Sequence, residues 1–172
     1  MHRRTLIFII VFVFVAVALF LLFSGFGEAP KKEEAVLPKV EAPNFILPDL
    51  SGKPLALSDF RGKVVFVTFW TTWCPSCRED LQTIQKLYND SDKEKFVILA
   101  VNLQEKRNEI KAFAEKHGFT FPILLDGANE VGRKYVVRAI PVTFLVDQEG
   151  NVVAKVLGVR EWKWDDLKVL VK

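Results

Sequence analysis

Cysteine, histidine and methionine are scarce in this chain of 172 residues, which contains two, two and one of them, respectively. Two cysteines cannot form the several widely spaced bridges that stabilise small secreted domains. The two histidines do not complete a zinc site, because His2 lies in the N-terminal segment and His117 precedes Gly118 at the expected end of a helix. The sequence therefore predicts no bound metal and no other cofactor.

Signals for nucleic-acid binding are also absent. The 24 basic and 21 acidic residues give a formal net charge of +3, part of which comes from Arg3 and Arg4. Neither an arginine-rich patch nor a glycine-rich phosphate loop occurs in the sequence. We therefore expect no nucleic-acid partner.

A long apolar run opens the chain, because Leu6 to Phe23 contains 18 apolar residues and follows two arginines. Such a run is long enough to cross the ~30 Å hydrocarbon core of a bilayer as one helix. It exceeds the roughly 7 to 15 apolar residues of a cleaved signal peptide, and Gly25-Phe26-Gly27 is a weak cleavage site. We therefore predict an uncleaved signal anchor over residues 1–27, with a transmembrane helix at 6–23. A cleaved signal peptide and a buried core helix are the alternatives.

The charges around this run predict its orientation, since lysine and arginine are retained on the cytoplasmic side of a membrane. Arg3 and Arg4 precede the run, whereas residues 28–34 carry charges of both signs. We expect a single-pass protein of the cell membrane, with a cytoplasmic N-terminus and all later residues outside the cytoplasm.

The remainder of the chain divides into a linker and one domain. Residues 28–42 contain Pro30 and Pro38 and few large apolar side chains, which is typical of an extended linker. Residues 43–172 form a stretch of about 130 residues, a common size for a domain with a single core.

Apolar runs alternate with helical patterns in this predicted domain. The run Val64 to Phe69 is apolar on both faces, as expected of a central strand. The alternation favours a mixed sheet with helices on both faces and an N-terminal β-hairpin. The predicted strands are Asn44 to Leu47, Pro54 to Leu57, Val64 to Phe69, Phe96 to Val101, Phe121 to Leu125, Pro141 to Val146 and Val152 to Val156. The predicted helices are Pro75 to Asn89, Glu105 to Lys116, Asn129 to Tyr135 and Glu161 to Val171.

The two cysteines lie in Trp73-Cys74-Pro75-Ser76-Cys77, after a predicted strand and at the start of a predicted helix. This arrangement is typical of a thiol-disulfide redox site. With Cys74 as N-cap and Pro75 at the first helical position, the amides of Ser76 and Cys77 are free to face the Cys74 sulfur, and the helix dipole favours its thiolate. We predict that Cys74 is the nucleophile and that Cys77 then attacks the mixed disulfide. The alternative is a pair of inert buried thiols.

Several segments of the chain resemble members of one protein family. The stretches Phe69 to Cys77 and Ile140 to Phe144 resemble the two active-site segments of the thioredoxin fold. Three further segments are similar to the TlpA/ResA-like branch of that fold: Ala42 to Phe45, Asp49 to Gly52 and Leu57 to Lys63. The resemblance implies a thioredoxin-like fold and thiol-disulfide oxidoreductase activity. That branch consists of membrane-tethered extracytoplasmic reductases, several of which serve cytochrome c maturation.

The resemblance also assigns roles to individual residues. It implies a cis peptide bond between Ile140 and Pro141 beside the cysteine pair, with the Ile140 backbone placed to pair with an extended substrate segment. Independently of the resemblance, the position of Trp73 directly before the nucleophile places it at the rim of the site, where it could form part of a docking surface, with core packing as the alternative. Thr68 occupies the position at which cytoplasmic thioredoxins have a buried aspartate, so no proton-handling role is expected there.

An acidic residue, Asp80, follows the cysteines. It stands at the position where ResA-like members carry a glutamate. A carboxylate near two thiols opposes a second negative charge and can relay a proton, so we expect Asp80 to influence the titration of the pair. The alternative is that Asp80, like Glu79, is a first-turn acid that complements the helix dipole. Trp162 and Trp164, in the predicted last helix, are interpreted as packing and surface residues.

Three functional classes remain open from the sequence. The first is a reductase of disulfides in exported proteins, with apocytochrome c as the substrate implied by the resemblance and a membrane electron donor as partner. The second is a thiol oxidase or isomerase, although Pro75-Ser76 adds no cationic group to stabilise a thiolate. The third is a copper-delivery protein that holds Cu(I) through Cys74 and Cys77, although the chain has a single methionine.

Overall fold

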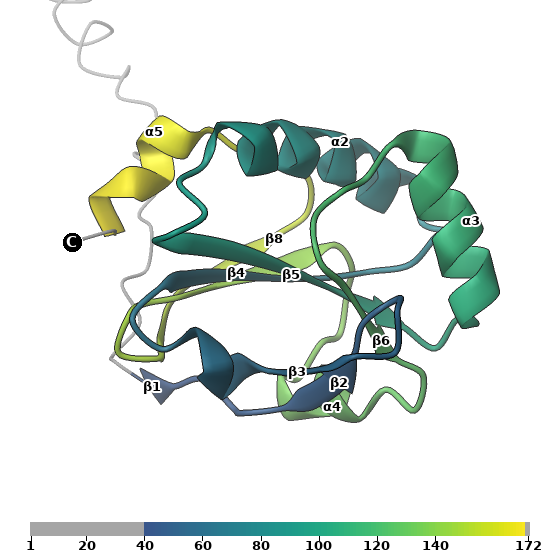
Figure 1. Cartoon of the computed structure of the whole chain (residues 1–172), viewed down its shortest axis with the longest axis horizontal. Coiled ribbons are helices and arrows are strands. Elements are labelled where there is room, and N and C mark those ends of the chain that lie inside the picture. Colours follow the sequence, from purple (N-terminus) through teal and green to yellow (C-terminus); the bar gives the residue numbers. More distant parts are fainter. Residues whose placement is uncertain (1–39, 171–172) are drawn as a thin grey trace, which may run out of the picture. The chain divides into compact units, whose positions relative to one another are not determined.

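The computed structural model describes residues 40–170, which form a mixed six-stranded sheet and a separate two-stranded hairpin (Figure 1). The sheet has the order β1-β8-β7-β4-β5-β6; β4, β5 and β6 are parallel, and the other neighbouring strands are antiparallel. The strands are β1 Val40–Glu41, β2 Ile46–Pro48, β3 Pro54–Ala56, β4 Val64–Trp70, β5 Phe96–Leu103, β6 Ile123–Asp126, β7 Val142–Val146 and β8 Asn151–Leu157. The helices are η1 Leu57–Phe60, α2 Pro75–Asp90, α3 Arg107–His117, α4 Glu130–Lys134, α5 Trp164–Leu167 and η2 Lys168–Leu170.

Strand β4 is central because every one of its seven residues is buried. Its side chains alternate between the two faces of the sheet, so that Phe66 and Trp70 belong to one core and Val67 and Phe69 to the other. Strand β4 pairs with β5 in parallel and with β7 in antiparallel orientation, so its backbone groups are hydrogen-bonded on both sides. The sequence prediction of a central strand here is confirmed.

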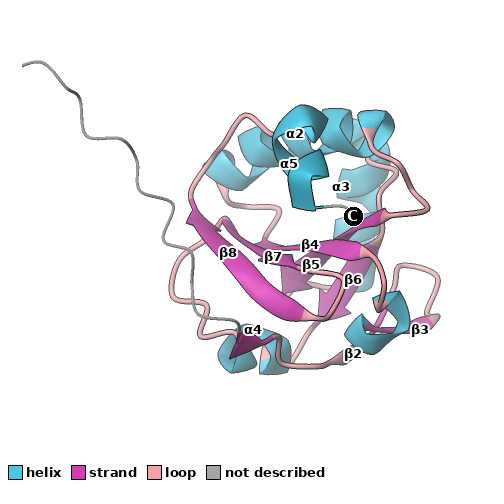
Figure 2. Ribbon diagram, turned by 90° about the vertical axis from the view of Figure 1, so that its left-hand side faces the viewer, coloured by secondary structure: helices cyan, strands magenta, loops and turns pink. Residues whose placement is uncertain are grey.

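Helices cover both faces of the sheet. Helices α2, α3 and α5 lie on one face, and α4 and the β2–β3 hairpin lie on the other (Figures 1 and 2). Leu81, Ile84 and Leu87 form the buried stripe of α2, and burying each of them stabilises the fold by roughly 1.5–3 kcal/mol. The predicted mixed sheet with helices on both faces and an N-terminal hairpin is therefore confirmed.

The last helix is shorter than predicted. The sequence pattern placed it at Glu161 to Val171, but α5 begins at Trp164 and is followed by the short helix η2. Residues before Trp164 are not helical because α2 binds their backbone: the Arg160 amide donates to Asp80, and the Arg160 carbonyl accepts from the Thr83 hydroxyl. These hydrogen bonds replace those of a helical turn.

The described part of the chain begins with a short strand that the sequence pattern did not predict. Val40 and Glu41 pair with Val152 and Asn151 of β8, and they fall within the range 28–42 assigned to the linker. The transmembrane helix predicted at 6–23 lies outside the described residues. Among residues 40–170, no helix has the length and apolar character needed to cross a membrane.

Candidate active site

The two cysteines form a disulfide at the N-terminus of α2. Cys74 is the N-cap with an extended backbone, and Pro75 occupies the first turn, as predicted. The Cys77 amide donates a hydrogen bond to the Cys74 sulfur at 3.1 Å, and the Ser76 hydroxyl oxygen lies 3.4 Å from the same sulfur. Ser76 thus contributes its hydroxyl where we had predicted its amide. An N–H donor and the positive end of the helix dipole both favour negative charge on the Cys74 sulfur.

The residues around the disulfide differ in their exposure. Trp73 is 69% exposed, whereas Cys74 is 4% and Cys77 0% exposed. Access to the pair is therefore through Cys74, which supports the assignment of Cys74 as the nucleophile and Cys77 as the shielded thiol. The ring of Trp73 does not pack in the core, so the packing alternative for this residue is wrong.

The peptide bond between Ile140 and Pro141 is cis, as predicted. The bond immediately precedes β7, whose first residue, Val142, is paired with Phe69 near the end of β4. Since β4 leads directly to the cysteines, the cis bond lies at the same end of the sheet as the disulfide. Ile140 packs against the core cluster that contains both cysteines.

A groove lies next to the cis bond. Ala139 and Val142, which flank Ile140-Pro141 in the chain, both line it. Exposed Val136 and Leu157 give the groove an apolar lining. Its remaining lining residues are Val137, Arg138 and Lys155. An extended apolar segment of another protein could therefore lie beside the cis bond.

Asp80 is buried in the same face of the domain as the cysteines, with 1% exposure. Its Oδ1 atom accepts a hydrogen bond from the Arg160 amide at 3.1 Å and another from the Trp162 indole N–H at 3.0 Å. Its Oδ2 atom is buried without a hydrogen-bond partner. Burial raises the pKa of Asp80 to about 6, although the two hydrogen bonds oppose this change.

A second buried carboxylate shows how unusual this arrangement is. Asp126 accepts the backbone N–H of Glu130 with Oδ1 and that of Gly132 with Oδ2, so both of its oxygens are bonded at the start of α4. Asp80 differs because one oxygen is left unbonded in the interior. A buried, half-bonded carboxylate near a redox pair is suited to accept and release a proton.

Glu105 braces the loop that leads into the cysteines. Its carboxylate accepts hydrogen bonds from the backbone N–H and the hydroxyl of Thr72 and from the side-chain amide of Asn102, at the end of β5. Asn102 is buried, which fixes the other end of this connection. The backbone just before Trp73 is thereby tied to the sheet.

Comparisons with known proteins agree with this geometry. The sequence profile of the AhpC/TSA family matches residues 38–155. The thiol-disulfide oxidoreductase ResA of Bacillus thuringiensis subsp. konkukian is 33% identical over 160 residues, which are 92% of this chain and 91% of that protein. This chain belongs to the ResA-like thiol-disulfide oxidoreductases of the AhpC/TSA family. The ResA of Bacillus subtilis is 37% identical over 126 residues, covering 73% of this chain and 70% of that protein.

Solved structures of similar proteins have the same fold. The crystal structure of StoA from Bacillus subtilis superposes with a TM-score of 0.65 at 26% identity, covering 77% of this chain and 98% of that one. A putative thiol:disulfide interchange protein DsbE from Chlorobium tepidum gives a TM-score of 0.70 at 29% identity, covering 79% and 96%. The predicted thioredoxin-like fold and thiol-disulfide oxidoreductase activity are confirmed.

Two features of this ResA-like site differ from the sequence interpretation. Glu79 and Asp80 are not first-turn acids, because α2 begins at Pro75 and has no acidic residue in its first turn. Trp162 is not a residue of the last helix; it precedes α5 and donates to Asp80. No local pattern indicated this contact.

Glu105 was also missed as a site residue of the ResA-like chain. The pattern placed it at the start of a helix, but α3 begins at Arg107. Its position two residues after β5, at the end where parallel strands deliver functional side chains, was the available signal.

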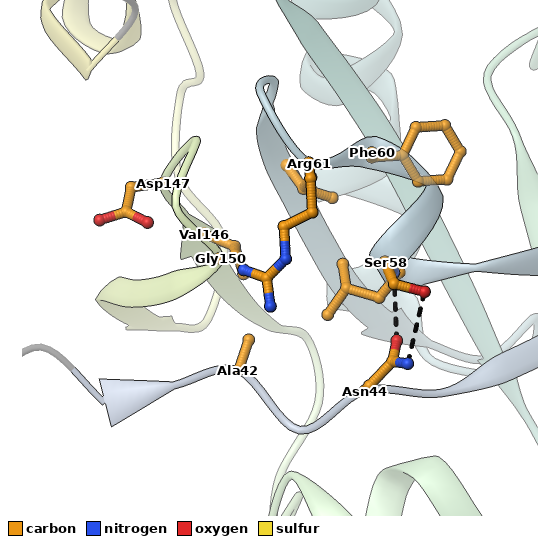
Figure 3. A pocket seen from close by; sticks show the side chains of 10 residues that line it. Ala42, Asn44, Ser58, Phe60, Arg61, Val146, Asp147 and Gly150 are labelled. Carbon is orange, nitrogen blue, oxygen red and sulfur yellow. Dashed lines mark hydrogen bonds between the residues drawn. The ribbon is translucent and has the colours of Figure 1, made fainter.

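A small pocket at the other end of the sheet is unrelated to this ResA-like site (Figure 3). Val65 and Val146, a pair near the start of β4 and the end of β7, line it. Arg61, another lining residue, bonds Glu41 at 2.8 Å and also the carbonyl of Glu149. The cysteines follow the opposite end of β4. The pocket therefore lies away from the redox site, in a region where the hydrogen bonds of Arg61 hold parts of the domain together.

Proposed function

We propose that this ResA-like protein is an extracytoplasmic reductase of disulfides in exported proteins, with apocytochrome c as its substrate. The observation that carries the proposal is the buried carboxylate of Asp80 on the face that contains the cysteines. Its pKa of about 6 means that it is mostly negative at neutral pH. A negative charge disfavours a neighbouring thiolate and so raises the thiol pKa.

This charge supports the reducing direction. A strong thiol oxidant is one whose reduced form is stabilised, as happens when its thiolate has a very low pKa. Helix α2 favours the Cys74 thiolate, but Asp80 opposes further negative charge and Pro75-Ser76 adds no cation. The dithiol is therefore less stabilised than in an oxidase and passes its electrons on more readily.

The reaction proceeds through a mixed disulfide. The Cys74 thiolate attacks one sulfur of the substrate disulfide, a bond forms between the two sulfurs, and the other substrate sulfur leaves as a thiolate. Cys77 then gives its proton to Oδ2 of Asp80 and attacks the Cys74 sulfur. The Cys74–Cys77 disulfide forms, and the second substrate thiolate leaves and takes the proton. Two electrons have passed from the dithiol to the substrate.

The surface at the cis bond supports substrate docking. Exposed Trp73 stands beside Cys74, and the apolar groove with Val136 and Leu157 lies next to Pro141. The backbone of Ile140 would hydrogen-bond an extended substrate segment, a conformation that an unfolded chain can readily adopt. This is why an unfolded substrate such as apocytochrome c is favoured over a folded one.

The reduction potential of the Cys74–Cys77 couple tests the direction. We expect a value at or below the ~−270 mV of thioredoxin, measured at pH 7 by equilibration with dithiothreitol buffers and quantification of free thiol. The Asp80→Asn variant is expected to be less reducing than the parent, because it removes the opposing charge. A potential near the ~−120 mV of a strong oxidant would identify an oxidase instead.

A reductase outside the cytoplasm needs a supply of electrons, because that compartment is oxidising. We therefore propose that residues 1–27 anchor the chain in the cell membrane through a helix at 6–23, with residues 28–42 as a linker. The anchor would hold the domain near a membrane electron donor that reduces Cys74–Cys77 after each cycle. The apolar run of Leu6 to Phe23 and the arginines before it support this topology.

Labelling in intact cells tests the anchor. After mild reduction, Cys74 is expected to react with a membrane-impermeant maleimide, and the labelled chain should remain in the membrane fraction. A chain with Cys74→Ser, Cys77→Ser and Thr5→Cys is the control, since its single thiol should stay unlabelled until the cells are broken. A soluble mature chain that begins near Glu28 by N-terminal sequencing would show that the segment is a cleaved signal peptide.

A further inference from the structure

Trp162 makes a specific contact to Asp80 that packing alone does not require. Its indole N–H donates to Oδ1 at 3.0 Å, and its ring packs edge-on against Phe66 with a centroid distance of 4.7 Å. Trp164, two residues further on, packs on Phe96 in the same core cluster, but its indole does not donate to Asp80. Of these two neighbouring tryptophans, Trp162 is therefore the one whose polar atom reaches the redox site.

The segment that carries Trp162 is attached to α2 at three points. The Arg160 amide and the Trp162 indole both donate to Oδ1 of Asp80, and the Thr83 hydroxyl, one turn further along α2, donates to the Arg160 carbonyl at 2.9 Å. All three contacts fix the position of Asp80 relative to this segment. None of them involves Oδ2.

We propose that Trp162 is a positioning residue for the dithiol reaction: its indole N–H fixes Asp80 through Oδ1 and leaves Oδ2 as the oxygen that exchanges a proton with Cys77. Asp80 and Cys77 are three residues apart on α2 and therefore lie on the same side of the helix. With Oδ1 occupied by two donors, rotation of the carboxylate would break both hydrogen bonds. The proposal rests on the proton-relay role given to Asp80 above, and it does not depend on the direction of the reaction.

The hydrogen bond also sets the acidity of Asp80. Burial raises its pKa, and the N–H donors of Arg160 and Trp162 lower it because they stabilise the charged form. The charged groups around it are Glu79 on its own helix and, on the facing segment, Arg160, whose guanidinium carbon lies 5.4 Å from the centre of the Trp162 ring. Cys77 is the thiol on the same side of α2. Removing the indole donor should therefore move the Asp80 titration to higher pH.

The two chemical steps can be separated with Ellman's reagent and the reduced full-length chain. Cys74 attacks the reagent first and releases one thionitrobenzoate, and Cys77 then attacks the Cys74 adduct and releases the second. In the second phase the Cys74–Cys77 bond forms as the bond from Cys74 to the aromatic thiol breaks, so its rate reports the deprotonation of Cys77. The absorbance of the released thionitrobenzoate, followed by stopped flow against pH, gives both rates.

Trp162→Phe should shift the pH midpoint of the second phase upward by about one unit and slow that phase about tenfold below the midpoint, as expected for loss of one hydrogen bond to a charged group. The first phase should change much less than the second, because Cys74 gives no proton to Asp80 and is affected only by its charge. Trp164→Phe, the matched control, should leave both phases unchanged. In an Asp80→Asn background, Trp162→Phe should have no further effect on the midpoint.

Any other outcome contradicts either the role of Trp162 or the relay role of Asp80. An unshifted midpoint in Trp162→Phe, or an equal shift in the Asp80→Asn background or in Trp164→Phe, would overturn the role of Trp162. If Asp80→Asn itself leaves the second phase unchanged, the relay role of Asp80 is wrong. Should Trp162→Phe fold poorly, site-specific replacement of Trp162 by benzothienylalanine, which has the same shape but no N–H, makes the same measurement.

Discussion

Replacement of Cys77 by serine is expected to leave the protein covalently joined to its substrate through Cys74. Cys77 is fully buried, and its amide already contacts the Cys74 sulfur, so it is placed to attack a mixed disulfide within the same molecule. Such oriented intramolecular attack corresponds to effective concentrations of about 10⁵ M or more, so turnover should fall on the order of a thousandfold or further. Turnover is measured as reduction of a disulfide peptide.

The trapped complex also identifies the substrate. It should appear as a higher band on non-reducing gels and disappear on reduction, and mass spectrometry should place the link at Cys74. The control is Cys74→Ser, in which buried Cys77 cannot reach a substrate and no complex should form. Equal trapping through Cys77 in that control would reverse the assignment of nucleophile and resolving thiol.

Replacement of Asp80 by asparagine is expected to change stability and activity in opposite directions. In the folded, oxidised protein the pKa of Asp80 is raised from 3.8 to about 6 by burial. Between these values the folded state holds a proton that the unfolded state has lost. The free energy of unfolding therefore falls as the pH rises from about 4 to about 6, and the loss persists above pH 6.

Asparagine removes this cost because it carries no charge, and its carbonyl oxygen can accept the same bonds from Arg160 and Trp162. We expect Asp80→Asn to raise the free energy of unfolding at pH 7 by about 3 kcal/mol, since the pKa is raised from 3.8 to about 6 and one unit of pKa corresponds to 1.36 kcal/mol. The gain should vanish below about pH 4. Urea unfolding of the oxidised forms at several pH values measures it.

Turnover of the same variant should fall about 100-fold at neutral pH, as expected for loss of a general base. The apparent thiol pKa, followed by alkylation of the reduced chain, should fall because a negative neighbour is gone. The matched control is Asp126→Asn, which should be destabilised instead, because its new amide donor faces the N–H of Glu130 or Gly132. Unchanged alkylation and turnover in Asp80→Asn would leave Asp80 with a structural role alone.

The features that the sequence predicted well are local ones. A buried strand that runs into Cys74-Pro75-Ser76-Cys77 specifies its own geometry, because Pro75 fixes the first turn and Cys74 caps it. The β2–β3 hairpin follows from turn chemistry, in which the Asp49 carboxylate accepts the amides of Ser51 and Lys53. The cis bond at Pro141 came from the family resemblance and not from any local pattern.

The features that were missed depend on residues far apart in the chain. Asp80 and Trp162 are 82 positions apart, and Thr72 and Glu105 are 33 apart. Helical periodicity placed Trp162 inside a helix. Periodicity cannot show that side chains of α2 form hydrogen bonds with the Arg160 backbone. The adjacent acids Asp165 and Asp166, which occupy the first turn of α5, were the local mark of the true helix start.

The brace at Glu105 bears on the entropy of substrate binding. The backbone of Thr72 and the end of β5 share one carboxylate, so the loop that presents Trp73 is already ordered before a substrate arrives. Ordering a flexible loop would otherwise subtract from the affinity. A substrate that docks on the exposed indole therefore restricts side chains alone, and short, weakly folded peptides can bind productively without a large contact area.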